Sequence, residues 1–101
     1  MKMMLLFPAL VAGTISYHVA ASEGLDQSEI RALVRQGEIM PLETILVQFP
    51  AKEYGKLLDL EVEREDGVVV YEFEFLRADG RIVEIEVDAR NGKILEQEFE
   101  D

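Results

Sequence analysis

The sequence predicts an α+β domain: two short N-terminal helices followed by a four-stranded antiparallel β-meander, with the second helix packed on one face of the sheet. Two observations carry this prediction. Apolar residues recur at helical spacing before residue 56 and alternate with polar residues after it. Three pairs of an acidic or amide residue with glycine then divide the alternating part into four segments.

The first helix is expected over residues 27–36. Asp26 can cap its first turn, and Glu29 stands three residues on, as a capping box requires. Gly37 is placed to end the helix, because glycine readily adopts the left-handed conformation found after helix C-termini. The apolar residues of this helix fall on one face, which we interpret as a core face: Ile30, Leu33 and Val34.

The second helix is expected to begin at Pro41, which suits a first helical turn, and to end before Pro50. Its apolar residues also recur at helical spacing and are interpreted as packing residues: Leu42, Ile45, Leu46 and Phe49. This helix is the one expected to cover the apolar face of the sheet.

The four strands are expected from residue 56 onward, each apolar on one face and polar on the other. Gly67, Gly80 and Gly92 are predicted to form the hairpin turns, where positive φ angles are needed. The last strand, about residues 93–99, is the least regular because Ile94 and Leu95 are adjacent.

Residues 1–21 resemble a secretory signal peptide. Lys2 is the only charged residue before Glu23, an apolar run follows it, and small residues precede Ser22. Cleavage is expected after Ala21, which would leave the protein periplasmic or secreted. The alternative is a retained membrane anchor, since the uncharged stretch approaches the roughly 20 residues of a spanning helix. Pro8, Gly13 and other interruptions favour cleavage.

The charge of the chain excludes several partners. The formal net charge is −11, and the part after the signal peptide is more negative still because Lys2 is removed with it. Such an excess of carboxylates argues against nucleic acid, whose phosphates need lysine and arginine. It argues equally against an anionic membrane surface. The chain has no cysteine, so the domain is expected to fold without a disulfide.

The residue types also argue against catalysis. The one histidine, His18, lies in the predicted signal peptide, and the chain has no cysteine or tryptophan. Nucleophile-histidine pairs and histidine zinc sites are therefore not expected. Paired carboxylates are abundant, but they alternate along open strands where ordinary pKa values are expected. We assign no catalytic, cofactor-binding or metal-binding residue and expect a binding protein.

Several segments together resemble a PepSY domain. The most recognisable is Val-Asp-Ala-x-x-Gly-x-x-Leu, here residues 87–95, and the strands over residues 55–63 and 70–75 fit the same pattern. The preceding residues 31–42 are similar to the lead-in of small periplasmic proteins built on one such domain. The expected organisation is a signal peptide over residues 1–21, a helical lead-in over 22–40 and a PepSY domain over 41–101.

The resemblance implies a noncatalytic module of the kind found in propeptides of secreted metallopeptidases and in cell-envelope proteins. A regulatory or inhibitory role in trans is expected, on a peptidase or sensor protein of the cell envelope. The alternative is a domain that senses a small molecule or a divalent cation through its acidic sheet face.

The outward positions of the predicted strands are nearly all acidic. We expect a candidate partner-binding face at Glu61, Glu63, Glu72, Glu74, Glu84 and Glu86. Three interpretations stay open at this stage. The face is a solvated surface that keeps the domain soluble, a docking surface for a basic partner, or a weak site for divalent cations, although a flat row of carboxylates converges poorly on one ion.

Overall fold

The computed structural model describes residues 22–100, so the predicted signal peptide and its cleavage site at Ala21 lie outside the described residues. Within residues 22–100, three helices and five strands follow one another: β2 (Ser22–Gly24), α2 (Gln27–Arg35), α3 (Leu42–Leu46), α4 (Ala51–Tyr54), β3 (Lys56–Glu65), β4 (Val68–Leu76), β5 (Ile82–Asp88) and β6 (Ile94–Glu100).

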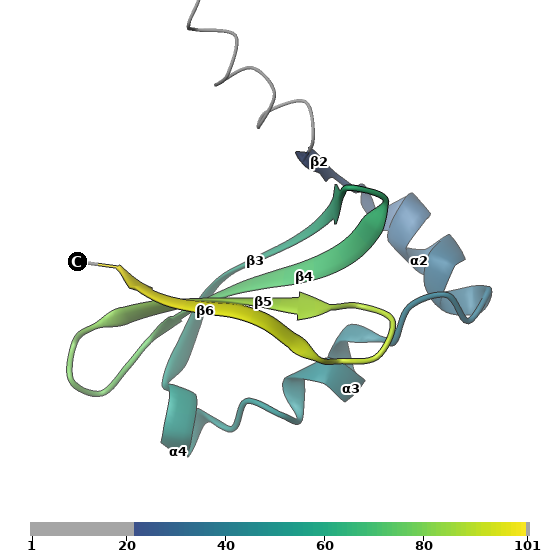
Figure 1. Ribbon diagram of the computed structural model, residues 1–101. Coiled ribbons are helices and arrows are strands. Elements are labelled where there is room, and N and C mark those ends of the chain that lie inside the picture. The colour runs from purple at the N-terminus through teal and green to yellow at the C-terminus, as the bar shows by residue number, and fades with distance from the viewer. Residues whose placement is uncertain (1–21, 101) are drawn as a thin grey trace, which may run out of the picture.

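The strands form one antiparallel sheet in the order β2-β3-β4-β5-β6 (Figure 1). The predicted four-stranded meander is confirmed. The short strand β2 is an addition, pairing Ser22 with Glu65 at one end of β3. A strand of three residues is too short to show a period of two, which is why the sequence pattern did not predict it.

The first helix forms as predicted. The Asp26 carboxylate accepts a hydrogen bond from the Glu29 backbone N–H, and the Glu29 side chain accepts one from the Asp26 N–H, which completes the capping box. At the other end, Gly37 has a φ of 75° and its N–H bonds to the Val34 carbonyl. The glycine therefore ends the helix as expected.

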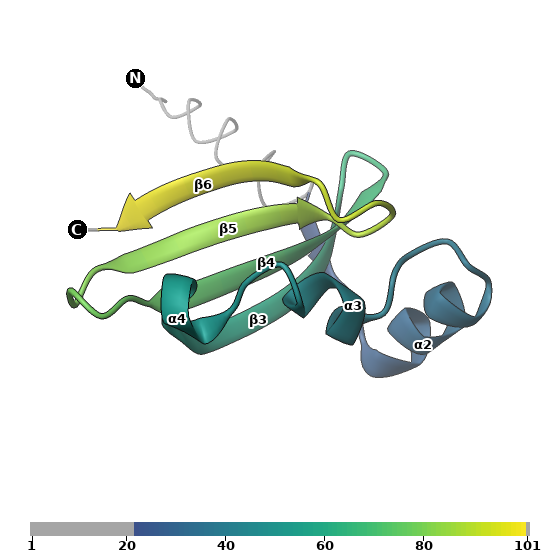
Figure 2. The ribbon, with the colours of Figure 1, turned by 90° about the horizontal axis from the view of Figure 1, so that it is seen from below.

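The second helix is shorter than predicted. It ends as α3 at Leu46, and a tight turn then places Phe49 before a further helix, α4, which follows Pro50. Both α3 and α4 lie on the same face of the sheet (Figure 2). Pro41 is the N-cap residue of α3, and Pro50 is the N-cap residue of α4. Proline suits the start of a helix because it has no N–H that would be left unpaired there.

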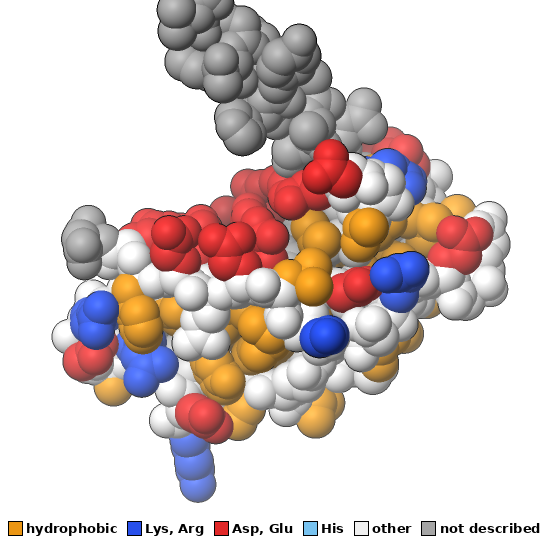
Figure 3. Space-filling model, in the orientation of Figure 1, with side chains coloured by type: hydrophobic (Ala, Val, Ile, Leu, Met, Phe, Trp, Pro, Cys, Tyr) orange, Lys and Arg blue, Asp and Glu red, His pale blue; other side chains and the backbone are white. Residues whose placement is uncertain are grey.

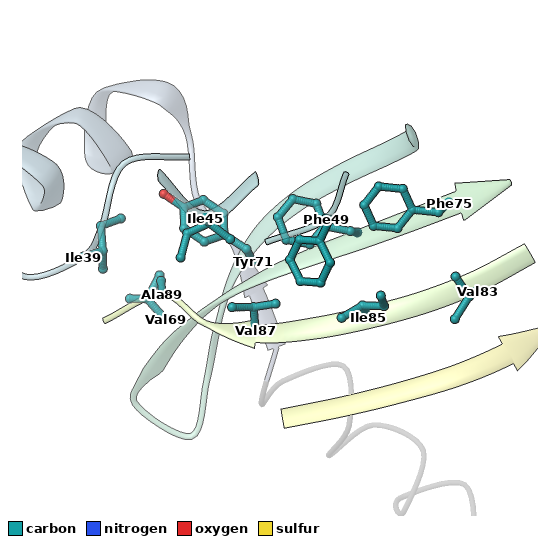
Figure 4. Close-up of a cluster of buried hydrophobic side chains, with 11 residues drawn as sticks. Ile39, Ile45, Phe49, Val69, Tyr71, Phe75, Val83, Ile85, Val87 and Ala89 are labelled. Carbon is teal, nitrogen blue, oxygen red and sulfur yellow. The ribbon is translucent and has the colours of Figure 1, made fainter. Parts of the chain in front are cut away.

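The core lies between these helices and the apolar face of the sheet (Figure 4). Phe49 packs against Phe73 and Phe75 of β4, with ring centroids 5.4 and 5.7 Å apart, and against Tyr54 of α4 at 5.0 Å. The Tyr71 hydroxyl donates a 2.7 Å hydrogen bond to the Met40 carbonyl, which ties the start of the α3 segment to the sheet. Buried residues of β5 complete the core: Val83, Ile85 and Val87.

Two register irregularities adjust the strand pattern. Leu57 pairs with Phe75 and Asp59 with Glu74, so Leu58 is an extra residue in β3 and is 43% exposed. Strict alternation with Leu60 and Val62 would put Leu58 on the core face; the bulge shifts the phase by one, so the expected alternation fails at this residue. A second irregularity between Ile94 and Glu96 accounts for the adjacent apolar residues at the start of β6.

Gly55, which joins α4 to β3, meets the tightest steric constraint among the described glycines. Its φ is 93° and its ψ is −149°, a combination that L side chains avoid. A Cβ atom built at Gly55 would collide with the Leu76 carbonyl of β4. At Gly80, φ is 86°, but a Cβ there meets no atom within 4 Å.

Substitution of these two glycines compares a positive φ alone, at Gly80, with a less favourable backbone conformation and a collision together, at Gly55. Gly80→Ala is expected to lower the free energy of unfolding by about 1 kcal/mol, the cost of a left-handed alanine. Gly55→Ala is expected to cost at least about 2 kcal/mol more, because the β4 backbone must also move. Urea unfolding of both variants checks this, and equal losses would show that the Leu76 contact is not restrictive.

Candidate functional site: an acidic sheet face

Two complete rows of carboxylates cross the sheet on the face away from α3 and α4. The pairing register places Asp59, Glu74, Glu84 and Glu98 opposite one another on β3 to β6, and a second row consists of Glu61, Glu72, Glu86 and Glu96. Glu63 lies two residues beyond Glu61 on β3, on the same face of the sheet, and pairs with Val70 of β4. We call these nine residues the acidic face, and Figure 3 shows acidic side chains gathered on this side of the molecule. All six residues predicted as a candidate partner-binding face belong to it.

Like charges directly opposite one another in a sheet are unfavourable, and the ionisation of the face reflects this. Partial burial, together with the negative charges of Glu63 and Glu84, raises the pKa of Glu72 from 4.5 to about 7. The Glu72 carboxyl group is therefore partly protonated at neutral pH. The ordinary pKa values expected from the sequence do not hold here, because the neighbouring strands supply both the burial and the opposing charges.

Several of these carboxyl groups interact through side-chain hydrogen bonds. A hydrogen bond with Glu63 is the largest cause that raises the pKa of Glu61. Burial raises the pKa of Glu84, and a hydrogen bond with Glu100 adds to it. Burial also raises the pKa of Glu86, while a hydrogen bond from Glu72 opposes that rise. These carboxyl groups thus bind protons more tightly than isolated carboxylates do.

Among residues 22–100, three sets of carboxylates lie close enough to share one cation, with ligand oxygens within 4.8 Å of one another. They are Glu61, Glu63 and Glu72; Glu65, Glu72 and Glu86; and Glu74, Glu84 and Glu100. Each set offers three residues, whereas calcium takes six to eight oxygen ligands. Water would have to complete the coordination, so the sets fit a weakly held cation.

Asp88 continues the alternation of Glu84 and Glu86 along β5, but it does not contribute to the acidic face. Its side chain is 8% exposed and accepts hydrogen bonds from the Arg90 backbone N–H at 2.9 Å and from the Arg90 guanidinium at 3.1 and 3.3 Å. The hydrogen bond from that guanidinium lowers the pKa of Asp88. The carboxylate organises the turn between β5 and β6, which is a structural role.

A second feature was not predicted from the sequence. An apolar cavity of about 380 Å³ lies between α2, α3 and the β3–β4 strands, with Ile30, Val34, Leu60 and Val62 among its lining residues. The α2 stripe predicted as core is only half-buried, because the helix stands off the sheet here. Helical periodicity identified the apolar face but contained no information about the distance to the sheet.

Residues 51–98 match the family model of the PepSY domain, described as "Peptidase propeptide and YPEB domain". The chain therefore carries a PepSY domain. PepSY domains are propeptide-like modules that generally lack catalytic activity, and they occur in secreted or extracellular proteins. Neither the curated proteins nor the solved structures provide a match to this chain.

The most recognisable PepSY segment of the chain, residues 87–95, forms the β5–β6 turn. Ala89 is fully buried, and its backbone bonds to Val69 and to Met40, which precedes α3. Asn91 closes the turn by accepting a hydrogen bond from the Lys93 N–H. This segment, which lies within the matched residues, therefore anchors the fold, and the acidic face lies beside it. No helix within residues 22–100 has the length and hydrophobicity to span a membrane.

The raised pKa values predict that the domain is more stable in mild acid than at neutral pH. A carboxyl group whose folded-state pKa lies above its unfolded value binds protons more tightly when folded, so the free energy of unfolding rises as the pH falls. For Glu72, the window runs from about 7 down to 4.5. Urea unfolding at pH 7.5, 6 and 5 is expected to give a midpoint that increases at each step.

Glu72→Gln should reduce this pH dependence more than any other single neutral substitution on the face, because its pKa is raised furthest toward neutrality. Glu53→Gln on α4, remote from the acidic face, is the matched control and should leave the dependence unchanged. A midpoint that stays constant or falls between pH 7.5 and 5 would contradict the electrostatic account. Below about pH 4 the trend should reverse, since Asp88 loses its bonds to Arg90 on protonation.

Proposed function

We propose that this protein is a noncatalytic regulatory module of the cell envelope that binds a peptidase or sensor protein in trans through its acidic face. The observation that carries the proposal is the pair of four-residue carboxylate rows, which are aligned by the strand register. The family supports it, since PepSY domains generally bind peptidases as propeptide-like modules.

The chemistry of the acidic face favours a basic partner. A surface of one sign attracts the opposite sign over distances of about one Debye length, roughly 10 Å at 0.1 M salt. Lysine or arginine side chains of a partner would also replace the like-charge contacts of the rows with opposite-charge contacts, which are favourable in a sheet. Binding would therefore relieve the like-charge repulsion that, after burial, contributes to the raised pKa of Glu72.

Solubility alone accounts less well for this arrangement. Charges spread over the whole surface keep a protein soluble without placing carboxylates opposite one another. Here the charges are concentrated on one face at a cost in stability, while the opposite face of the sheet is covered by helices. Local arrangements that weaken a fold are expected at sites of function.

Reversal of charge within the rows should abolish partner capture. Two variants test this: Glu72→Lys/Glu74→Lys on β4 and Glu84→Lys/Glu86→Lys on β5. Each places lysines opposite glutamates of the neighbouring strand. Neither should be less stable than the parent, because opposite-charge pairs replace like-charge pairs. Immobilised protein is incubated with envelope extract of the source cells, and captured proteins are identified by mass spectrometry. We expect a peptidase or a sensor ectodomain that is released by 0.5 M salt and lost with both variants.

Glu38→Lys/Glu53→Lys is the matched control, because it changes the net charge equally at exposed positions outside the acidic face. This variant should capture the same protein as the parent. Capture that survives reversal on β4 and β5, or that is lost equally with the control, would refute docking through the acidic face.

A divalent cation is the competing ligand for the same surface, since Glu72 belongs to two of the three carboxylate sets. A ligand that binds only the folded state must raise its melting temperature. A melting temperature that rises in millimolar calcium, and does so less in Glu72→Gln, would assign the face to cation sensing in place of protein docking. We expect no rise beyond that given by sodium chloride of equal ionic strength.

A further inference from the structure

The last strand, β6, is a complete sheet edge of unusual composition. It is seven residues long and pairs with β5 alone, so one side of its backbone is open along its length (Figure 2). At the opposite end of the sheet, β2 pairs with part of the β3 edge. An open edge presents backbone N–H and carbonyl groups to which another extended chain can bond.

The side chains of β6 differ between the two faces of the sheet. Glu96, Glu98 and Glu100 alternate along the strand, and the first two end the carboxylate rows of the acidic face. On the opposite face of the sheet, Phe99 lies opposite Val83, is 38% exposed, and has the Arg81 guanidinium carbon 4.0 Å from its ring centroid. Ile94 and Leu95 are exposed at the start of the strand, at 39% and 49%. Three of the seven large hydrophobic side chains that are exposed in residues 22–100 therefore belong to this one edge.

Protective charges alone do not explain this edge. Proteins commonly guard exposed edges with charged residues, proline or short strands. The β6 edge has the charges, but it is also long and carries exposed apolar side chains, which favour association. A second copy of the chain is a poor occupant, because antiparallel pairing of β6 with itself would set glutamates against glutamates.

We propose that β6 accepts a strand from the partner, and that this strand alternates basic and apolar residues. The proposal rests on the proposed function and names the partner's chemistry. Lysine or arginine at every second position would extend the carboxylate rows with opposite charge, beside Glu96 and Glu98. The intervening apolar residues would extend the other face of the sheet beside Phe99. The paired segment is about six or seven residues, the length of β6 itself.

A defined peptide tests this without knowledge of the natural partner. The probe is a seven-residue peptide of alternating lysine and valine with blocked ends. A control peptide of the same composition carries its lysines in one block and its valines in another. Titration into the ¹⁵N-labelled protein at low salt is expected to show binding of the alternating peptide, at least about tenfold tighter than the block peptide. The largest amide shifts should fall on residues 94–100.

Two N-methylated versions of the alternating peptide distinguish strand pairing from general attraction between charges. In a strand, the N–H groups of successive residues point to opposite edges, so methylation of all lysine nitrogens blocks one edge and methylation of all valine nitrogens blocks the other. If the peptide adds to β6, one methylated version loses binding by about tenfold or more and the other does not. Equal affinity of the two versions, or shifts spread evenly over β3 to β5, would overturn the inference.

Substitutions in the protein give a further test. Glu96→Lys/Glu98→Lys should strongly lower the affinity for the alternating peptide. Glu38→Lys/Glu53→Lys, which gives the same net charge, should leave that affinity unchanged. Failure of the peptide to bind would refute strand addition but leave docking on the acidic face intact, because the capture experiment depends on β4 and β5. A dimer in ultracentrifugation that pairs through β6 would also overturn the inference, since a second copy would then occupy the edge. Loss of that dimer in Glu96→Lys/Glu98→Lys would show that β6 is involved.

Discussion

The packing of the β4 aromatic side chains against Phe49 is the interaction on which the rest of the structure depends. Tyr71, Phe73 and Phe75 are all buried, and with Phe49 and Tyr54 they join the sheet to the short helices. Because successive strand residues point to opposite faces, this packing commits every intervening residue of β4 to the other face. The register with β5 then aligns Glu72 with Glu86 and Glu74 with Glu84. The acidic face is thus a geometric consequence of the core.

The turn over residues 87–95 and the acidic face have opposite effects on the stability of the domain. The turn over residues 87–95 holds β5, β6 and the α3 lead-in together through the buried Ala89 and the Asp88–Arg90 ion pair at 3.1 Å. The acidic face weakens the fold at neutral pH, because partial burial and the neighbouring negative charges both disfavour the ionised form of Glu72 and raise its pKa. A domain of about 80 residues has little stability to spare. Retaining aligned like charges on such a domain is the physical basis of our proposal that the face has a ligand.

Much of this could be predicted from the sequence, because it depends on local patterns. The period of two along β4 and β5 placed Glu72, Glu74, Glu84 and Glu86 on one face, and Asp26 with Glu29 marked the start of α2. What sequence reasoning missed depends on contacts between distant residues. The bulge at Leu58 and the burial of Asp88 are set by neighbouring strands and turns. The raised pKa of Glu72 required the register, and the cavity beside α2 required the distance from helix to sheet.

The central claim is that a protein partner covers the sheet on its acidic side and at its β6 edge. Amide hydrogen exchange of the protein, alone and bound to the captured envelope protein, tests it most directly, because it locates protection along the backbone without any substitution. The account predicts that binding slows exchange most in β6, whose outer edge is open, with smaller effects in β5. Protection confined to α2, α3 and α4, with β6 unchanged, would contradict it and place the partner on the helical side.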